Sequence, residues 1–147
     1  MTTPQVKDAL NKQLANWNVL YTKLHHYHWY VTGPEFFTLH VKFEEFYTEA
    51  AQYIDDIAER ILTIKGKPLA SLQAYLKETS LKEAAGTESP SEMVASVRND
   101  FETIIKEASA AIETAESAGD QATADYLTGM IEALEKHVWM LNAYLGQ

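Results

Sequence analysis

The stretch that decides the fold is residues 10–40, which read LNKQLANWNVLYTKLHHYHWYVTGPEFFTLH. Up to the turn at Gly33-Pro34, its apolar positions recur at alternating steps of four and three residues, a spacing typical of one buried helical face rather than of a strand. These positions are Leu10, Leu14, Trp17, Tyr21, Leu24, His28 and Val31. Upstream, Thr3 followed by Pro4 has the pattern of a helix cap. We therefore predict one long helix from Pro4 to the turn.

Three further stripes follow the turn, where a stripe is a series of apolar residues at helical spacing that marks one face of a helix. The second helix is expected from about residue 35 to residue 65, where Gly66-Lys67-Pro68 ends it. Residues 89–92, Ser-Pro-Ser-Glu, form a capping box that predicts the start of the third helix. Residues 118–120, Ala-Gly-Asp, end that helix and cap a fourth, which runs to about Leu145.

The connection between the second and third helices is longer and less regular. Ser71 has the character of a cap for a short helix there, and residues 86–90 have a loop composition. Four long helices with one crossover connection correspond to the ferritin-like arrangement among helical bundles. The predicted fold is therefore all-α, a ferritin-like four-helix bundle with a short extra helix between helices two and three, forming a single domain over residues 1–147.

Composition narrows the possible chemistry. The chain has no cysteine, so a metal site has to use His, Asp or Glu. Its formal net charge is −9, which disfavours binding to the phosphate backbone of nucleic acid. We find no signal-peptide pattern and no run of eighteen apolar residues, so we expect a soluble, cytoplasmic protein without a membrane partner.

The negative charge is unevenly distributed. Residues 1–74 hold seven basic and eight acidic side chains, whereas residues 75–147 hold five and thirteen. Four acids near the third turn, Glu113, Glu116, Asp120 and Asp125, either make a helix end soluble or line a path for a cation. The sequence leaves both readings open.

Histidines flank the first turn. His28 precedes Gly33 by five residues and His40 follows Pro34 by six, so an antiparallel hairpin brings the two imidazoles to a similar height. On the second helix, Glu44, Asp55 and Glu59 share with His40 an arc of roughly 100°. Taken alone, the pattern favours a buried core histidine for His28, and a solvated helix face for His40 and the acids.

Distance along the helix separates these residues into two groups. With a rise of about 1.5 Å per residue, Asp55 and Glu59 lie roughly 22 and 28 Å from His40. Ligands of one ion have to lie within about 5 Å of one another. One chain therefore cannot form a single site from all of these residues, whereas a two-fold axis near the middle of the second helix would bring both groups together.

A Glu-x-x-His motif, which would build a site inside one bundle, is absent. Spacing leaves two alternatives, an intersubunit site or no site.

The motif residues resemble the Dps family, ferritin-like mini-ferritins also called DNA-binding proteins from starved cells. The resemblance rests on residues 18–29, NVLYTKLHHYHW, together with Val31-Thr32-Gly33, residues 37–40 (FTLH), residues 43–45 (FEE) and residues 55–60, DDIAER. It covers roughly residues 16 to 62 closely, and the helix layout matches over the whole chain.

The resemblance implies a function and a ligand set. His28 and His40 of one subunit, with Asp55 and Glu59 of its two-fold mate, would form a ferroxidase centre for one or two iron ions. Glu44 would be a further acidic ligand, and Trp29 an aromatic near the centre that takes part in electron transfer. Such proteins form a homo-dodecameric shell, oxidise Fe(II) preferentially with hydrogen peroxide and store the ferric mineral, which protects the cell from peroxide.

Two further expectations concern residues outside this motif. In the family, DNA binding often depends on a Lys/Arg-rich tail, and no such tail is visible here, so we expect DNA binding to be absent. His137 lacks the acidic neighbours that a ligand needs, and Glu49 has the pattern of an ordinary exposed charge.

Overall fold

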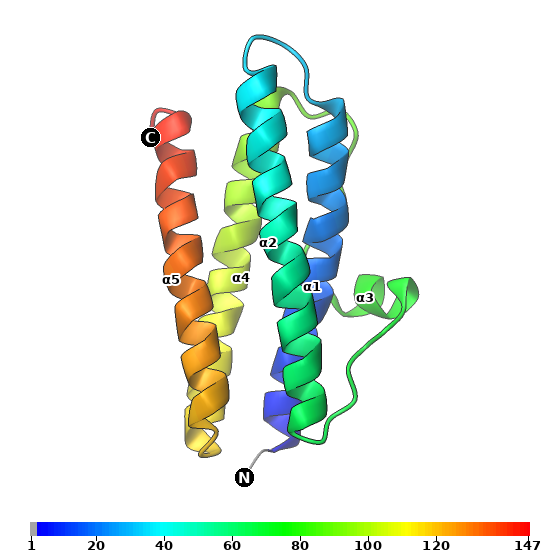
Figure 1. Ribbon diagram of the computed structural model, residues 1–147, viewed down its shortest axis with the longest axis vertical. Coiled ribbons are helices and arrows are strands. Elements are labelled where there is room, and N and C mark those ends of the chain that lie inside the picture. The colour runs from blue at the N-terminus through cyan, green and yellow to red at the C-terminus, as the bar shows by residue number, and fades with distance from the viewer. Residues whose placement is uncertain (1–2) are drawn as a thin grey trace.

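The structure is a computed structural model that describes residues 3–147. Within that range it contains five α-helices and no strand, as the sequence predicts. Four long helices lie side by side as a bundle (Figure 1). They are α1 (Pro4–Tyr30), α2 (Phe36–Thr63), α4 (Pro90–Ser117) and α5 (Gln121–Tyr144). The short α3 (Leu72–Glu78) lies outside the bundle in the connection between α2 and α4, beside α1 (Figure 1).

The predicted caps are present. The side chain of Thr3 accepts a hydrogen bond from the Val6 amide, and Pro4 occupies the first position of α1. Ser71 caps α3 in the same way through the Ala74 amide. Ser89 and Glu92 form the complete capping box of α4. These side chains satisfy amide groups that have no partner inside the helix, which fixes where each helix begins.

The predicted stripes form the hydrophobic core. Most stripe residues of α1 are fully buried, as are the large side chains of α2 that face them, Leu39, Phe43, Phe46, Ile57 and Ile61. Within residues 3–147, no helix combines the length and the apolar character needed to cross a membrane. The helices are therefore amphipathic bundle helices, with one face in the core and one outside it.

Polar contacts fix the register between helices. Lys23 of α1 and Asp100 of α4 form a buried ion pair with an Nζ to Oδ2 distance of 2.8 Å. Burial raises the pKa of Asp100 more than the Lys23 charge lowers it. Gln13 of α1 donates to the Ile104 carbonyl of α4 at 3.3 Å. A buried polar group without its partner destabilises the fold by more than the paired contact stabilises it. These pairs therefore favour a single alignment of α1 on α4.

Candidate metal centre

The turn between α1 and α2 brings two histidines together. His28 lies in the last turn of α1, and His40 lies in the second turn of α2, directly beyond the loop. Gly33 has a φ of 104°, a backbone conformation that glycine adopts without steric cost. This tight reversal lets the two helices run antiparallel, so the predicted proximity of His28 and His40 is confirmed.

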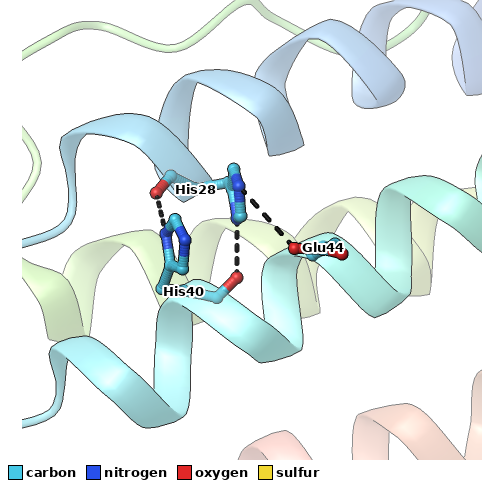
Figure 2. Close-up of side chains that lie close together, drawn as sticks. All are labelled: His28, His40 and Glu44. Atoms are coloured by element: carbon cyan, nitrogen blue, oxygen red, sulfur yellow. Dashed lines mark hydrogen bonds and ion pairs between the residues drawn. The ribbon is translucent and has the colours of Figure 1, made fainter.

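The imidazoles of His28 and His40 are fixed by each other's backbone. His28 Nδ1 lies 2.7 Å from the His40 carbonyl oxygen, and His40 Nδ1 lies 2.7 Å from the His28 carbonyl oxygen (Figure 2). A carbonyl oxygen only accepts, so each Nδ1 donates its hydrogen, and the neutral form of each ring keeps the Nε2 lone pair available. The rings stack with centroids 3.7 Å apart. Both nitrogens are thereby oriented as ligands before a metal arrives.

Glu44 completes the group that this chain supplies. Its Oε1 lies 3.9 Å from His28 Nε2, one helical turn beyond His40 (Figure 2). Ligand atoms of His28, His40 and Glu44 all lie within 4.8 Å of one another, and this is the one such group of His, Asp and Glu side chains in residues 3–147. His28 is only 6% exposed, whereas Glu44 is exposed. Two nitrogens and one carboxylate suit iron, manganese or zinc.

Asp55 and Glu59 lie apart from this group. Both are exposed on α2, and neither belongs to the cluster formed by His28, His40 and Glu44. The chain alone thus provides three of the five predicted ligands in one place.

Tyr47 and Phe36 place aromatic rings against the two histidines of the site. The Tyr47 ring meets His28 edge-on with centroids 5.3 Å apart and stacks on His25 at 3.8 Å. Burial, followed by the negative charge of Glu44, raises the pKa of Tyr47. The Trp29 side chain is 67% exposed and contacts the His25 ring at 5.2 Å. The sequence signal for Tyr47 is its position three residues after Glu44, on the same helical face.

His137 and Glu49 form a pair that the sequence analysis missed. His137 Nε2 lies 3.1 Å from Glu49 Oε2, and the Tyr53 hydroxyl donates to Glu49 Oε1 at 2.9 Å. Burial acts to raise the pKa of Glu49, but these hydrogen bonds outweigh it and the net pKa is lowered. The expectation that Glu49 is an ordinary exposed charge is therefore wrong. The pair joins α5 to α2, a contact between distant segments that helical spacing alone does not reveal.

The four acids near the third turn have two different environments. Asp120 is 6% exposed, caps α5 through the Thr123 amide and forms an ion pair with Arg60 Nη2 at 2.9 Å. The main contacts of Asp120 therefore fix the start of α5 and hold it against Arg60 of α2. Glu113, Glu116 and Asp125 are exposed.

Comparison with known proteins agrees with this architecture. Residues 7–147 match the model of the ferritin-like domain. The chain is 52% identical to DNA protection during starvation protein 2 of Bacillus anthracis, over 97% of this chain and 98% of that protein. A crystal structure of a Dps protein from Bacillus brevis superposes with a TM-score of 0.96, at 55% identity and 99% coverage of both chains.

For a third similar protein, the superfamily is also described. The Dps protein from Vibrio cholerae O1, described as a member of a broad superfamily of ferritin-like diiron-carboxylate proteins, has a TM-score of 0.93 at 38% identity, covering 95% of this chain and 88% of that one. The fold, the His and Glu site and these matches define a ferritin-like protein. Within that class, the chain belongs to the Dps family.

Proposed function

We propose that this protein oxidises Fe(II) with hydrogen peroxide at sites shared between two subunits, and stores the ferric product inside a hollow homo-dodecamer. The observation that carries the proposal is the pair His28 and His40, whose Nε2 lone pairs converge beside Glu44 while the exposed Asp55 and Glu59 remain elsewhere on α2. A chain that bound its metal alone would have no reason to leave two of its three acidic ligands far from the histidines.

The proposed pairing follows from helix geometry. Asp55 and Glu59 lie roughly 22 and 28 Å along α2 from His40, because each residue adds about 1.5 Å. An antiparallel two-fold contact between two copies of α2 places the acidic end of one copy beside the histidine end of the other. Each dimer then holds two equivalent sites, each with nitrogen ligands from one subunit and carboxylates from its mate.

The residues have distinct roles in the proposed chemistry. The neutral imidazoles of His28 and His40 bind Fe(II) without adding charge, whereas Glu44, Asp55 and Glu59 supply the negative charge that stabilises Fe(III). Two Fe(II) ions give two electrons to one peroxide molecule, which takes up two protons and leaves as two waters. Paired irons thereby avoid releasing a hydroxyl radical. We assign Trp29 a place at the outer edge of the centre, beyond His25.

Complementation between inactive variants tests the shared site. A His28→Ala, His40→Ala variant and an Asp55→Ala, Glu59→Ala variant are each expected to lose Fe(II) oxidation. A mixed dimer of the two has one site in which all four residues are intact. Co-expression at equal levels with random pairing should therefore restore about one quarter of the sites. The readout is peroxide-dependent absorbance of Fe(III) in shells whose mixed composition is verified by mass spectrometry.

The matched control places both defects in the same half of the site. Co-assembly of a His28→Ala variant with a His40→Ala variant leaves every site with a damaged histidine pair, so no recovery is expected. Recovery in the first mixture but not in the second supports the shared site. Equal recovery, or none in verified mixed shells, would refute it.

The charge of the chain argues against DNA as a partner in the proposed function. With a net charge of −9, the protein repels the phosphate backbone. We expect no retardation of duplex DNA in a gel shift at low salt. Retardation that disappears with added salt would establish electrostatic DNA binding instead.

A further inference from the structure

The methionines of the described range 3–147 differ in how far solvent reaches them. Met93 of α4 and Met130 of α5 are buried, at 5% and 2% exposure, whereas Met140 of α5 is 43% exposed. A thioether sulfur carries lone pairs that an oxidant such as peroxide converts to a sulfoxide. Met140 is therefore the methionine in this range that peroxide in solution reaches most easily.

Met140 also lines a pocket between α2 and α5. The start of α2 and the end of α5 lie at the same end of the bundle (Figure 1). The pocket between them has a volume of about 150 Å³, and its walls include Leu39, Phe46 and Leu141. One added oxygen atom takes up a small part of this volume, so the sulfoxide of Met140 fits without overpacking the core.

The same pocket offers hydrogen-bond donors to a sulfoxide oxygen. Its lining includes Lys42, Thr38 and Tyr144. The Lys42 ammonium carries three donor hydrogens and pairs with Glu45 at 2.9 Å, and the other two side chains carry hydroxyls. The two buried methionines differ, because an oxygen added there would enter the apolar core, where an unpaired acceptor destabilises the fold.

We propose that Met140 is a site of reversible oxidation, which peroxide converts to methionine sulfoxide while the fold stays intact. The sulfur attacks one peroxide oxygen, the O–O bond breaks and an S–O bond forms. The other oxygen leaves with both hydrogens as water, so the sulfur loses two electrons and peroxide gains them. A methionine sulfoxide reductase restores the thioether, as two thiols become a disulfide and the oxygen leaves as water.

This inference goes beyond the proposed function and does not rest on it, because the reaction at Met140 uses no iron. The two share only the oxidant. The reaction changes the chemistry of the pocket, since a polar sulfoxide replaces an apolar thioether between α2 and α5. A chain without any iron oxidation would leave this inference untouched, so the two proposals fail separately.

Trypsin separates the methionines for the measurement. Cleavage after Lys and Arg leaves Met93 in residues 83–98, Met130 in residues 107–136 and Met140 in residues 137–147. The assembled full-length protein is freed of metal with a chelator, treated with hydrogen peroxide and digested. Tandem mass spectrometry then follows the gain of one oxygen in each peptide over time.

Oxidation at Met140 should be at least about tenfold faster than at Met93 or Met130. Equal rates in the assembled protein would overturn the proposal. So would a slower rate at Met140, which is the result expected if a second copy of the chain covers this face.

Met140→Leu is the matched control, because leucine keeps the apolar volume and has no sulfur. Residues 137–147 of this variant should gain no oxygen. The same peptide contains Trp139, whose side chain is 66% exposed and is open to radical attack. Oxygen found on Trp139 instead of Met140 would show that radicals are the oxidant and would refute the assignment.

The treated protein also tests whether the fold tolerates the sulfoxide. Its elution volume in size-exclusion chromatography should be unchanged, and its thermal midpoint should shift by less than about 2 °C. A mixture of the two stereospecific methionine sulfoxide reductases, with dithiothreitol, should remove the oxygen from the folded protein. Disassembly of the treated parent but not of treated Met140→Leu, or a sulfoxide that the reductases leave in place, would refute reversible oxidation.

Discussion

His28 and His40 each donate a hydrogen bond from Nδ1 to the backbone carbonyl of the other, and both distances are 2.7 Å. The two residues thus fix each other's tautomer without a hydrogen bond from a third side chain. Because the acceptors are main-chain atoms of α1 and α2, the geometry of the ligands is as rigid as the packing of the two helices. The second ring nitrogen of a metal-binding histidine usually donates to a carboxylate, a backbone carbonyl or water, and here each histidine's own backbone carbonyl accepts from the other.

Removal of either imidazole should weaken metal binding strongly. For His28→Ala, we expect the affinity of the tightest Zn²⁺ site to fall at least about tenfold, because a nitrogen ligand and the hydrogen bond that orients His40 are both lost. Zn²⁺ is chosen because it is not oxidised. Calorimetric titration measures the change. His26→Ala is the control, since His26 lies outside the cluster and stacks on Tyr30. Equal affinities for both variants would contradict the assignment.

Glu88 should make the free energy of unfolding depend on pH. Burial acts to raise its pKa, but hydrogen bonds from Tyr27 and from the Ala85 and Gly86 amides lower it to about 2. Because the pKa is lower in the folded chain than its ordinary value of 4.5, the carboxylate stabilises the fold above about pH 4.5, and this stabilisation is lost as the pH falls towards 2.

Replacement of Glu88 tests this dependence. Glu88→Gln is expected to cost about 1–3 kcal/mol at neutral pH, the usual range for a hydrogen-bonded charge. The deficit against the parent should shrink as the solution is acidified, as measured by urea unfolding at several pH values. Glu83→Gln, at an exposed position in the same connection, should have a small effect at every pH. A deficit for Glu88→Gln that does not change with pH would show that the charge is irrelevant.

The acids near the third turn should differ sharply in their effect on stability. Asp120→Ala removes the cap of α5 and the partner of Arg60, for an expected loss of about 2–3 kcal/mol. Asp125→Ala, at an exposed position five residues further along the chain, should change stability by less than about 0.5 kcal/mol. Asp120→Asn keeps the cap but not the charge, so its loss of stability should lie between those of the other two variants. Similar unfolding midpoints for all three would contradict the structural role of Asp120.

Two glycines should respond in opposite directions to the same substitution. A Cβ at Gly66 would lie 2.8 Å from Ile61 Cγ2 and 3.1 Å from the Ile61 carbonyl oxygen, so Gly66→Ala should destabilise the end of α2. At Gly129, within α5, a Cβ meets no atom within 4 Å. Gly129→Ala should therefore stabilise the protein by about 0.5–1 kcal/mol through helix propensity. Thermal unfolding of the two variants measures the difference, and a shift in the same direction would contradict it.

Local sequence signals predicted most of the fold. Caps such as Thr3, Ser89 and Asp120 act on amides two or three residues away, and apolar spacing reports which face of a helix is buried, so both can be read from a short window. The convergence of His28 and His40 also follows from counting residues across one tight turn. The contacts that joined distant segments were not predictable in this way. Glu49 meets His137 and Arg60 meets Asp120 only because α5 and its preceding turn pack against α2.

The contact of Tyr47 with His28 was equally hard to predict from a family motif read residue by residue. It depends on which face of α2 turns toward His28, and on the stack with His25. Helical spacing does place Tyr47 on the same face of α2 as Glu44, because the two are three residues apart. The orientation of the ring required the packed helices.

The short loop between the two histidines has a consequence for how the protein is made. His28 and His40 are 12 residues apart, and every atom that orients them belongs to the α1–α2 hairpin. Contacts so close in sequence form early and rapidly, and the N-terminal part of a chain leaves the ribosome first. The nitrogen ligands can therefore be arranged while α4 and α5 are still being synthesised, so in the proposed shared centre the histidine half depends on a local folding event and the carboxylate half on the encounter of two chains.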